Sequence, residues 1–425
     1  MSHRNSDRPS RRLFFLLPFF LLLSGKLAAR GAAPSPTGAV VTADCFGMHI
    51  HHAGSTTPWP SVPFGEWRLW DAYVAWPNLE PQKGQWDFAT LDSYVQLAQT
   101  HNVGLLLPLG LSPQWASSRP TETSIYQPGN AAPPSSATDW ITYVQTVATR
   151  YKGKIHAYEI WNEPNLVGYW TGDVTQMVAL VKAASQIIHG IDPQALVVSP
   201  SSTGIYGVDW LSQFLAAGGG QYVDVIGYHF YVNPQPPEAM VPLIAQVQAA
   251  MQQNGAGSKP LWNTETGWHT PDPFPSLSLA AAYLVRAYLL VLSSGVPRFY
   301  WYAWDNHGWV SIETTQSDSV TLTPAGSAYG IVYSWLVGAQ LNGCQESAND
   351  TWTCQLQRGT SQEWVVWNSS GTQSIALSGM PGATTVTPLL GSLSKISGTT
   401  LQVTQVPELV VAAPATPSIR AISPH

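Results

Sequence analysis

Residues 155–165 read IHAYEIWNEPN, a short apolar run that ends in one carboxylate between an asparagine and a proline. The run 155–163 has the length and composition of a buried strand. Proline disfavours right-handed helical angles in the residue before it, so Glu163 is expected to stay extended at the strand end. The surrounding chain tells which kind of sheet this strand belongs to.

Outward from this strand, short apolar runs alternate with longer helical patterns. The expected strands are 45–51, 66–70, 103–110, 155–163, 195–201, 223–231, 260–265 and 298–304. Helical spacing of apolar residues marks the segments 140–151, 174–189, 237–253, 277–294 and 325–337. Between the first two strands, 52–65 contains three prolines and is not expected to hold a full helix. Eight strands alternating with helices predict a (β/α)₈ TIM barrel over residues 40–337.

The pattern changes after residue 338 to short alternating strands. These predict a small C-terminal all-β sandwich domain over 338–415, followed by a tail over 416–425. A doubly wound sheet is the alternative for the first domain, but no glycine-rich phosphate-binding turn follows the first strand.

The N-terminus has the pattern of a signal peptide, expected to span residues 1–33. Four arginines precede the apolar run LFFLLPFFLLLS at 13–24, and small residues follow it. The run is too short to be expected to anchor the chain in a membrane after cleavage. Without residues 1–33, which hold six Lys or Arg and one Asp, 13 basic and 24 acidic side chains give a net charge of −11. The protein is expected to be secreted or periplasmic, and that charge disfavours nucleic acid as a partner.

The chain has three cysteines. Cys344 and Cys354 have a spacing that suits a bridge across a hairpin in an exported protein, which leaves Cys45 unpaired. No CxxC metal-binding pattern is present.

Two isolated carboxylates are expected on one rim of the barrel. Glu163 ends the fourth strand, and Glu265 ends the seventh in LWNTETGW. Catalytic groups of such barrels lie at the C-terminal ends of strands. A pair of carboxylates beside Trp and Asn indicates glycoside hydrolysis, in which one serves as acid and the other as nucleophile or base. The alternative is two surface glutamates at loop starts.

The motifs WNEPN and TETGW resemble those of clan A of the retaining glycoside hydrolases over residues 44–336. The segments WPNLEPQKGQWDF (76–88) and LSPQWAS (111–117) resemble loops of the same clan. Family 39, which includes β-xylosidases and joins a barrel to a β-sandwich, is the most similar, and family 5 is second. The resemblance implies that Glu163 is the acid/base, that Glu265 is the nucleophile and that no cofactor is needed.

The same resemblance implies roles for neighbouring residues. Asn162 would bind the sugar 2-OH, and Tyr231 would donate to the nucleophile. Trp301 would lie under the sugar at the cleavage point, with Trp304 as its substitute.

Further candidates follow from the strands themselves. Arg68 on the second strand would keep Glu265 ionised, or would form a salt bridge inside the barrel. His229 would touch sugar hydroxyls or lie satisfied in the core. Glu159 has the strand parity of Glu163 but lies deeper, so it is expected to be a buried partner for a base or a hydroxyl.

The segment GMHIHH (47–52) holds three histidines. His49 and His51 share one strand face and His52 lies on the other, so at most two could bind one metal ion. Sugar contact or core packing is favoured over a metal site. The resemblance to clan barrels favours His51 as the residue near the sugar.

These features predict an exported retaining glycoside hydrolase acting on a β-linked oligo- or polysaccharide through two glutamates. Three alternatives stay open: a transglycosylase with the same site, a non-catalytic carbohydrate-binding barrel, and a metal-dependent hydrolase built on the histidines.

Overall fold

A computed structural model describes residues 38–269 and 274–413. The expected signal peptide (1–33) and tail (416–425) lie outside the described residues. Within the described parts, no helix is both long and apolar enough to cross a membrane.

The barrel sheet is parallel and contains all eight expected strands. Its strands are β1 (Phe46–Met48), β2 (Glu66–Arg68), β3 (Gly104–Leu109), β4 (Ala157–Ile160), β5 (Leu196–Val198), β6 (Ser202–Thr203), β7 (Ile226–His229), β8 (Leu261–Thr266) and β9 (Phe299–Trp301). They are ordered β5-β4-β3-β2-β1-β9-β8-β7-β6, and the two-residue β6 is an addition to the expected set. A parallel bridge from Val198 to Val225 joins β5 to the start of β7, so the sheet closes on itself.

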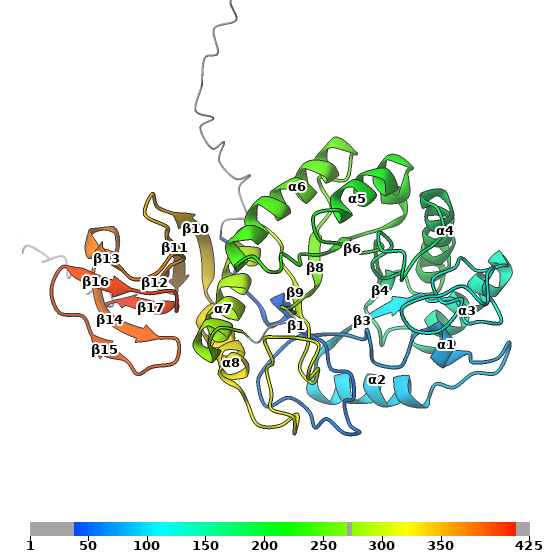
Figure 1. The fold of residues 1–425 in the computed structure, drawn as a ribbon, viewed down its shortest axis with the longest axis horizontal. Helices are drawn as coiled ribbons and strands as arrows, with labels where there is room; N and C mark the ends of the chain where they lie inside the picture. The colour runs from blue at the N-terminus through cyan, green and yellow to red at the C-terminus, as the bar shows by residue number, and fades with distance from the viewer. Residues whose placement is uncertain (1–37, 270–273, 414–425) are drawn as a thin grey trace, which may run out of the picture. The chain divides into compact units, whose positions relative to one another are not determined.

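Helices surround these strands (Figure 1). They are α1 (Trp76–Leu79), α2 (Ala89–His101), α3 (Ala137–Arg150), α4 (Val174–Ile191), α5 (Gly207–Ala216), α6 (Met240–Gln253), α7 (Leu277–Ser293) and α8 (Pro324–Leu336). Side chains cap several N-termini: Asp173 forms a capping box with Gln176 on α4, and Thr323 accepts from Gly326 on α8. The described chain between β1 and β2 forms no helix, as its prolines predict.

The C-terminal part consists of two antiparallel sheets. Its strands are β10 (Gln340–Glu346), β11 (Thr351–Arg358), β12 (Ser361–Asn368), β13 (Gln373–Ala376), β14 (Ala383–Pro388), β15 (Ser394–Lys395), β16 (Thr400–Val403) and β17 (Glu408–Ala412). Six form one sheet in the order β10-β11-β12-β17-β14-β15, and β13 pairs with β16. Trp364, Val366 and Val410 of the larger sheet share a buried cluster with Val403 of the smaller one. The expected small all-β domain is present, with sheets of unequal size.

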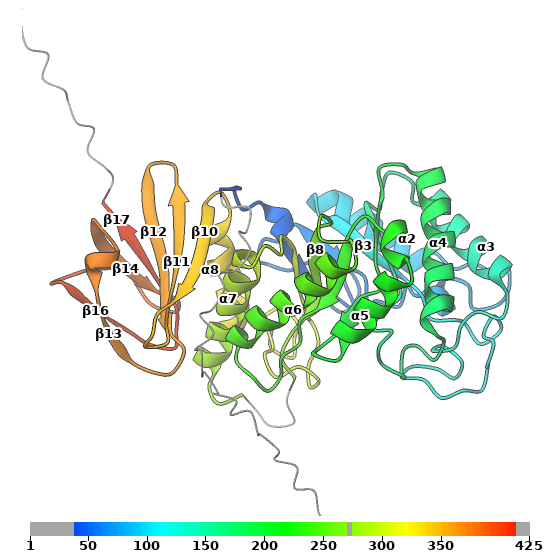
Figure 2. The same cartoon turned by 90° about the horizontal axis from the view of Figure 1, so that it is seen from above.

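The predicted disulfide is confirmed. Cys344 and Cys354 are directly opposite each other on β10 and β11, with their Cα atoms 3.9 Å apart. Strand β10 lies beside α7 (Figures 1 and 2), and the N–H of Cys344 donates to the Ser293 hydroxyl at 2.7 Å. Cys45 is the free cysteine of the described residues.

Candidate active site

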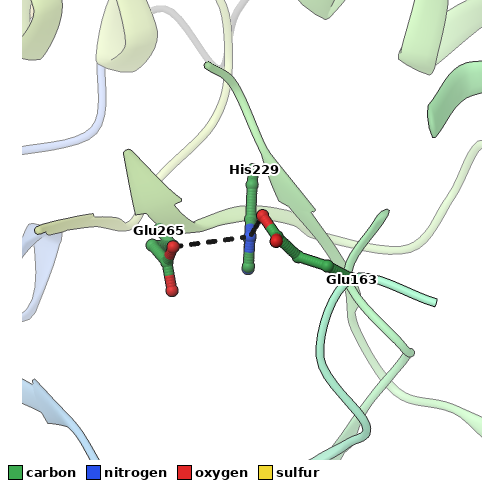
Figure 3. Close-up of side chains that lie close together, drawn as sticks. All are labelled: Glu163, His229 and Glu265. Atoms are coloured by element: carbon green, nitrogen blue, oxygen red, sulfur yellow. Dashed lines mark hydrogen bonds and ion pairs between the residues drawn. The ribbon is translucent and has the colours of Figure 1, made fainter. Parts of the chain in front are cut away.

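The two glutamates meet at the C-terminal ends of the barrel strands (Figure 3). Glu163 follows β4 by three residues, and Glu265 is the penultimate residue of β8. One oxygen of each carboxylate and one nitrogen of His229 all lie within 4.8 Å of one another. Both glutamates are buried, with exposures of 7% and 5%. Parallel strands bring their carboxyl ends to one rim, which explains how residues 102 positions apart converge.

The backbone at Glu163 differs from the sequence expectation. Its φ is +44° and that of Trp161 is +71°, so Glu163 is left-handed and not extended. Pro164 disfavours only the right-handed helical region, and tertiary hydrogen bonds select the left-handed one. The N–H of Glu163 donates to the Ser201 carbonyl at 2.9 Å, and that of Trp161 to Leu109 at 2.7 Å. Left-handed residues other than glycine are costly and cluster at functional sites.

Arg68 joins the carboxylates to their surroundings. Its guanidinium donates to Glu159 Oε2 at 2.6 Å, to Glu265 Oε2 at 2.7 Å and to Asn162 Oδ1 at 2.6 Å. Arg68 and Glu159 are fully buried. The salt bridge inside the barrel is therefore present, and the same guanidinium contacts Glu265, where its charge opposes the rise in the pKa of that carboxyl. Glu159 has the expected partners, since it accepts from the Thr264 hydroxyl (3.2 Å) as well as from Arg68.

His229 lies between the two glutamates (Figure 3). Its Nδ1 is 2.9 Å from Glu163 Oε1 and 3.9 Å from Glu265 Oε1. Burial lowers the pKa of His229 to about 4, so the ring is neutral near pH 7. Of the two expectations, sugar contact or core packing, the structure shows a fully buried histidine whose partner is Glu163.

Tyr231 is brought to Glu265, as the resemblance to the clan implied. Its hydroxyl donates to Glu265 Oε1 at 3.0 Å. Burial raises the pKa of Tyr231 well above its ordinary value, so the hydroxyl keeps its proton and remains a donor.

The two carboxyl groups are hard to ionise together. Burial raises the pKa of Glu163 and that of Glu265 to about 7. The positive charge of Arg68 opposes this rise for both glutamates. Of these two, its guanidinium donates only to Glu265, which also accepts from the Tyr231 hydroxyl. Glu163 has a hydrogen bond with the Thr203 side chain, but none with the guanidinium. Because two donors, one of them charged, favour the ionised form of Glu265 more strongly, a single proton shared by the pair belongs on Glu163.

The tryptophans expected beneath the sugar do not face the site. Trp301 is 0% exposed and stacks on Trp268 with ring centroids 6.0 Å apart, and Trp304 is 1% exposed. Tyr302, between them, turns the other way and is one of the residues that line a cavity beside the glutamates. Of the segment 298–304, Tyr302 therefore lines the cavity, whereas the expected Trp301 and Trp304 are buried away from it.

The histidines of GMHIHH divide between two places. His49, and not the favoured His51, is beside the pair, with Nε2 3.7 Å from Glu265 Oε2 and 3.1 Å from Arg68 Nη1. His51 lines the cavity, and its Nδ1 is 3.9 Å from Asp305 Oδ1. Strand parity puts both on one face but does not rank their depth. His49 is thus a site residue that sequence reasoning missed.

Among the described residues, the group with metal-ligand spacing is Glu163, His229 and Glu265, and it includes none of the GMHIHH histidines. In that group Arg68 already places a positive charge 2.7 Å from Glu265. A metal ion there would meet electrostatic repulsion from the guanidinium.

A cavity of about 560 Å³ opens beside the pair. Its lining includes His51, Trp70, Asp71, Tyr126, Tyr302 and Asp305, but neither glutamate. The Asp71 carboxylate accepts from the hydroxyls of Tyr302 (2.6 Å) and Tyr126. Asp71, Tyr126 and Tyr302 were not predicted. Asp71 directly follows the predicted strand 66–70 and Tyr302 lies within 298–304, whereas no sequence signal marks Tyr126 in its long loop.

Known proteins with similar sequences match about half of the chain. It is 26% identical over 234 residues to a β-xylosidase of Geobacillus stearothermophilus, and 25% identical over 229 residues to one of Caldicellulosiruptor saccharolyticus. These matches span 48% of this chain and less than half of each relative, 44% and 46%.

Among solved structures, the chain is similar to a family 39 glycoside hydrolase from the gut symbiont Bacteroides cellulosilyticus WH2. The TM-score is 0.71 at 17% identity, covering 88% of this chain and 81% of that one, a likeness of fold. Residues 67–296, more than half of the chain, match the family model of Glycosyl hydrolases family 39. The segment carrying Arg68, both glutamates, His229 and Tyr231 is therefore the matched segment, and the chain belongs to glycosyl hydrolases family 39.

Proposed function

We propose that the protein hydrolyses β-glycosidic bonds with retention of configuration, with Glu265 as nucleophile and Glu163 as acid and base. The observation that carries this proposal is the approach of the two carboxylates to within 4.8 Å. Retaining enzymes hold their carboxyl groups about 5–5.5 Å apart, whereas inverting enzymes need roughly 6.5–9.5 Å to admit a water molecule.

The surroundings of the pair support the division of roles. An ionised Glu265 attacks the anomeric carbon, and Arg68 and Tyr231 stabilise its negative charge. Glu163 gives its proton to the leaving oxygen, and the raised pKa of about 7 suits a group that must still carry a proton near neutral pH. Glu163 then removes a proton from the water that cleaves the glycosyl–Glu265 ester, which restores both groups.

Asn162 is suited to hold the sugar. Its Oδ1 accepts from Arg68, which fixes the amide, while its buried Nδ2 has no hydrogen-bond partner among the described residues. A buried donor without a partner is costly, so this group is poised to bind a sugar hydroxyl. We assign it the 2-OH of the sugar being cleaved.

The substrate and compartment belong to the same proposal. The two curated relatives named above are β-xylosidases, so β-xylosidic linkages are the first substrates to test. The N-terminal sequence pattern and the Cys344–Cys354 disulfide support export to an oxidising compartment.

The test uses alanine variants and azide with an aryl β-glycoside. Glu163→Ala is expected to form the glycosyl-enzyme from an activated substrate and then stall, because no base prepares the water. Azide needs no base, so it should restore turnover and give the β-glycosyl azide. Glu265→Ala should lose turnover, and any azide product should be the α-anomer.

Asp71→Asn is the matched control, because it changes a carboxylate that shares no hydrogen bond with the pair in the described structure. It should show no azide rescue. If Glu163→Ala gave the α-azide and Glu265→Ala the β-azide, Glu163 would be the nucleophile and Glu265 the acid and base. Transfer of the sugar to added saccharides in place of water would make the protein a transglycosylase, and binding without turnover would make it a carbohydrate-binding barrel.

A further inference from the structure

The cavity beside the glutamates is built by four segments at the C-terminal rim of the barrel. His51 and His52 follow β1, Trp70 and Asp71 follow β2, Tyr126 and Gln127 lie in the loop after β3, and Tyr302 and Asp305 follow β9. Its volume of about 560 Å³ lies within the range of small-molecule sites. The glutamates do not line it, so it is a place for a part of the ligand that does not react.

Tyr302 connects the cavity to the reacting centre. Its ring centroid is 5.1 Å from that of His49, which contacts Arg68 and lies beside Glu265. The same ring is 5.2 Å from the ring of His51, which lines the cavity. A ligand that extends from Glu265 past Tyr302 therefore enters the cavity.

The charged residues that line the cavity suit an uncharged, hydroxylated ligand. Asp71 and Asp305 line it, and the described lining contains neither Lys nor Arg. Their carboxylates are held by protein donors: Asp305 accepts from the N–H of His51 (2.8 Å) and of His52 (3.0 Å). An anionic sugar would be repelled by these two charges with no cation to balance it.

His51 provides an unused hydrogen-bonding atom there. The residue is 6% exposed, and its Nε2 has no partner among the described residues. Burial lowers the pKa of His51, so the ring is neutral. With the Nδ1 side toward Asp305, Nε2 carries a lone pair that can accept from a hydroxyl.

We propose that this cavity binds a second, uncharged glycosyl unit on the non-reducing side of the cleaved bond. The proposal rests on the function proposed above. We assign this side because Tyr302, which lines the cavity, packs against His49, and His49 lies beside Glu265, the residue that bonds the sugar being cleaved. The preferred substrate thus carries at least two sugars before the cleaved bond.

The test compares kcat/KM for a 4-nitrophenyl β-xyloside and the corresponding β-xylobioside. Because the binding energy of the remote sugar unit lowers the free energy of the transition state, kcat/KM of the wild type should be at least about tenfold higher for the bioside than for the monoside. His51→Ala should reduce this bioside-to-monoside ratio several-fold. His51→Gln, which keeps an acceptor, should recover part of it.

Two further measurements make the test specific. His101→Ala is the matched control, because His101 is an exposed residue at the end of α2, and it should leave the ratio unchanged. As inhibitors, xylobiose should bind at least about tenfold more tightly than the disaccharide that carries a terminal uronic acid, because of the two carboxylates.

The outcomes separate the two proposals. Failure to hydrolyse any aryl β-glycoside contradicts the proposed function, and failure on the two xylosides alone contradicts only the choice of sugar. Equal kcat/KM for both, with His51→Ala lowering them equally, contradicts only the second-unit proposal. Faster cleavage of unmodified xylobiose than of the aryl bioside would place the cavity on the leaving-group side and overturn the assignment, and equal inhibition by the uronic acid compound would overturn the preference for an uncharged unit.

Discussion

A single buried guanidinium organises the candidate active site of this protein. Arg68 holds three acceptors at once, Glu159, Asn162 and Glu265, from distances of 2.6 to 2.7 Å. Its planar fork of donors can satisfy all three, which a lysine ammonium cannot do with the same geometry. The orientation of Asn162 and the ionisation of Glu265 therefore depend on one residue.

Arg68→Met is expected to lower kcat/KM on an aryl glycoside by about 100-fold or more. It also removes the charge that lowers the pKa of Glu265, so that pKa rises. Because the nucleophile must be ionised, the acid limb of the pH–kcat/KM profile should move to higher pH. Arg68→Lys is the control: it keeps the charge and should move the limb less. An unmoved acid limb in Arg68→Met would show that another group keeps Glu265 ionised.

At the scale of elements, the two ends of the barrel strands have different chemistry. The C-terminal ends hold the glutamates, whereas a cluster of charged residues around the buried Glu66 lies at the N-terminal ends. Glu66 at the start of β2 pairs with Arg298 (2.8 Å) and with His156 (3.3 Å), and Arg298 also reaches Asp44 at 3.1 Å. These residues precede or begin β1, β2, β4 and β9, so the cluster joins four strands. Charges at this end of a barrel serve stability.

Glu66→Gln should change how stability depends on pH. Burial raises the pKa of Glu66 from 4.5 to about 7. Between these pH values the folded state binds more protons at Glu66 than the unfolded state does, so the free energy of unfolding falls as the pH rises. His156 acts oppositely, because burial lowers its pKa to about 4, and stability rises with pH from there to about 6.5. In Glu66→Gln, only the contribution of His156 to the pH dependence of stability remains.

Urea unfolding at several pH values checks this expectation. The unfolding free energy of Glu66→Gln relative to the wild type should increase by on the order of 2 kcal/mol between pH 4.5 and 7. Glu122→Gln, at an exposed ion pair with Arg119, serves as the control and should show little pH-dependent difference. Parallel curves for Glu66→Gln and wild type would mean that Glu66 is not protonated in the folded protein.

At the scale of the molecule, the barrel and the larger C-terminal sheet share one hydrophobic core. Trp352, Val365 and Trp367 of the sheet belong to the same buried cluster as residues of α7 and the barrel strands. Polar contacts reinforce it: Glu238 accepts from Trp367 Nε1 at 2.8 Å and from Arg286 Nε at 2.8 Å. The two parts are therefore expected to unfold together.

Calorimetry should show one unfolding transition for the wild type, with no separate transition of the C-terminal sheet. Glu238→Ala leaves the buried Arg286 charge and the Trp367 N–H without their partner, at a cost of about 2–5 kcal/mol. The melting temperature of the whole protein should fall accordingly. Glu313→Ala, a change at a more exposed carboxylate beside His307, is the control. Two resolved transitions in either protein would contradict a shared core.

Sequence alone determined the features that depend on short stretches of chain. Apolar runs and helical spacing located all eight barrel strands, the change to an all-β pattern near residue 338, and the missing helix after β1. Glu163 and Glu265 were found because a strand end fixes the rim on which a side chain lies. The bond between Cys344 and Cys354 was found because residues ten apart can face each other across a hairpin.

Tertiary structure alone decided the features set by how strands tilt and how deep a side chain lies. Strand parity could not choose between His49 and His51, because both point to one face and only barrel closure sets their depth. It could not foresee that Tyr302 faces the cavity while Trp301 and Trp304 are buried. The left-handed angle of Glu163 depends on a hydrogen bond to Ser201, 38 residues away, which no local pattern encodes.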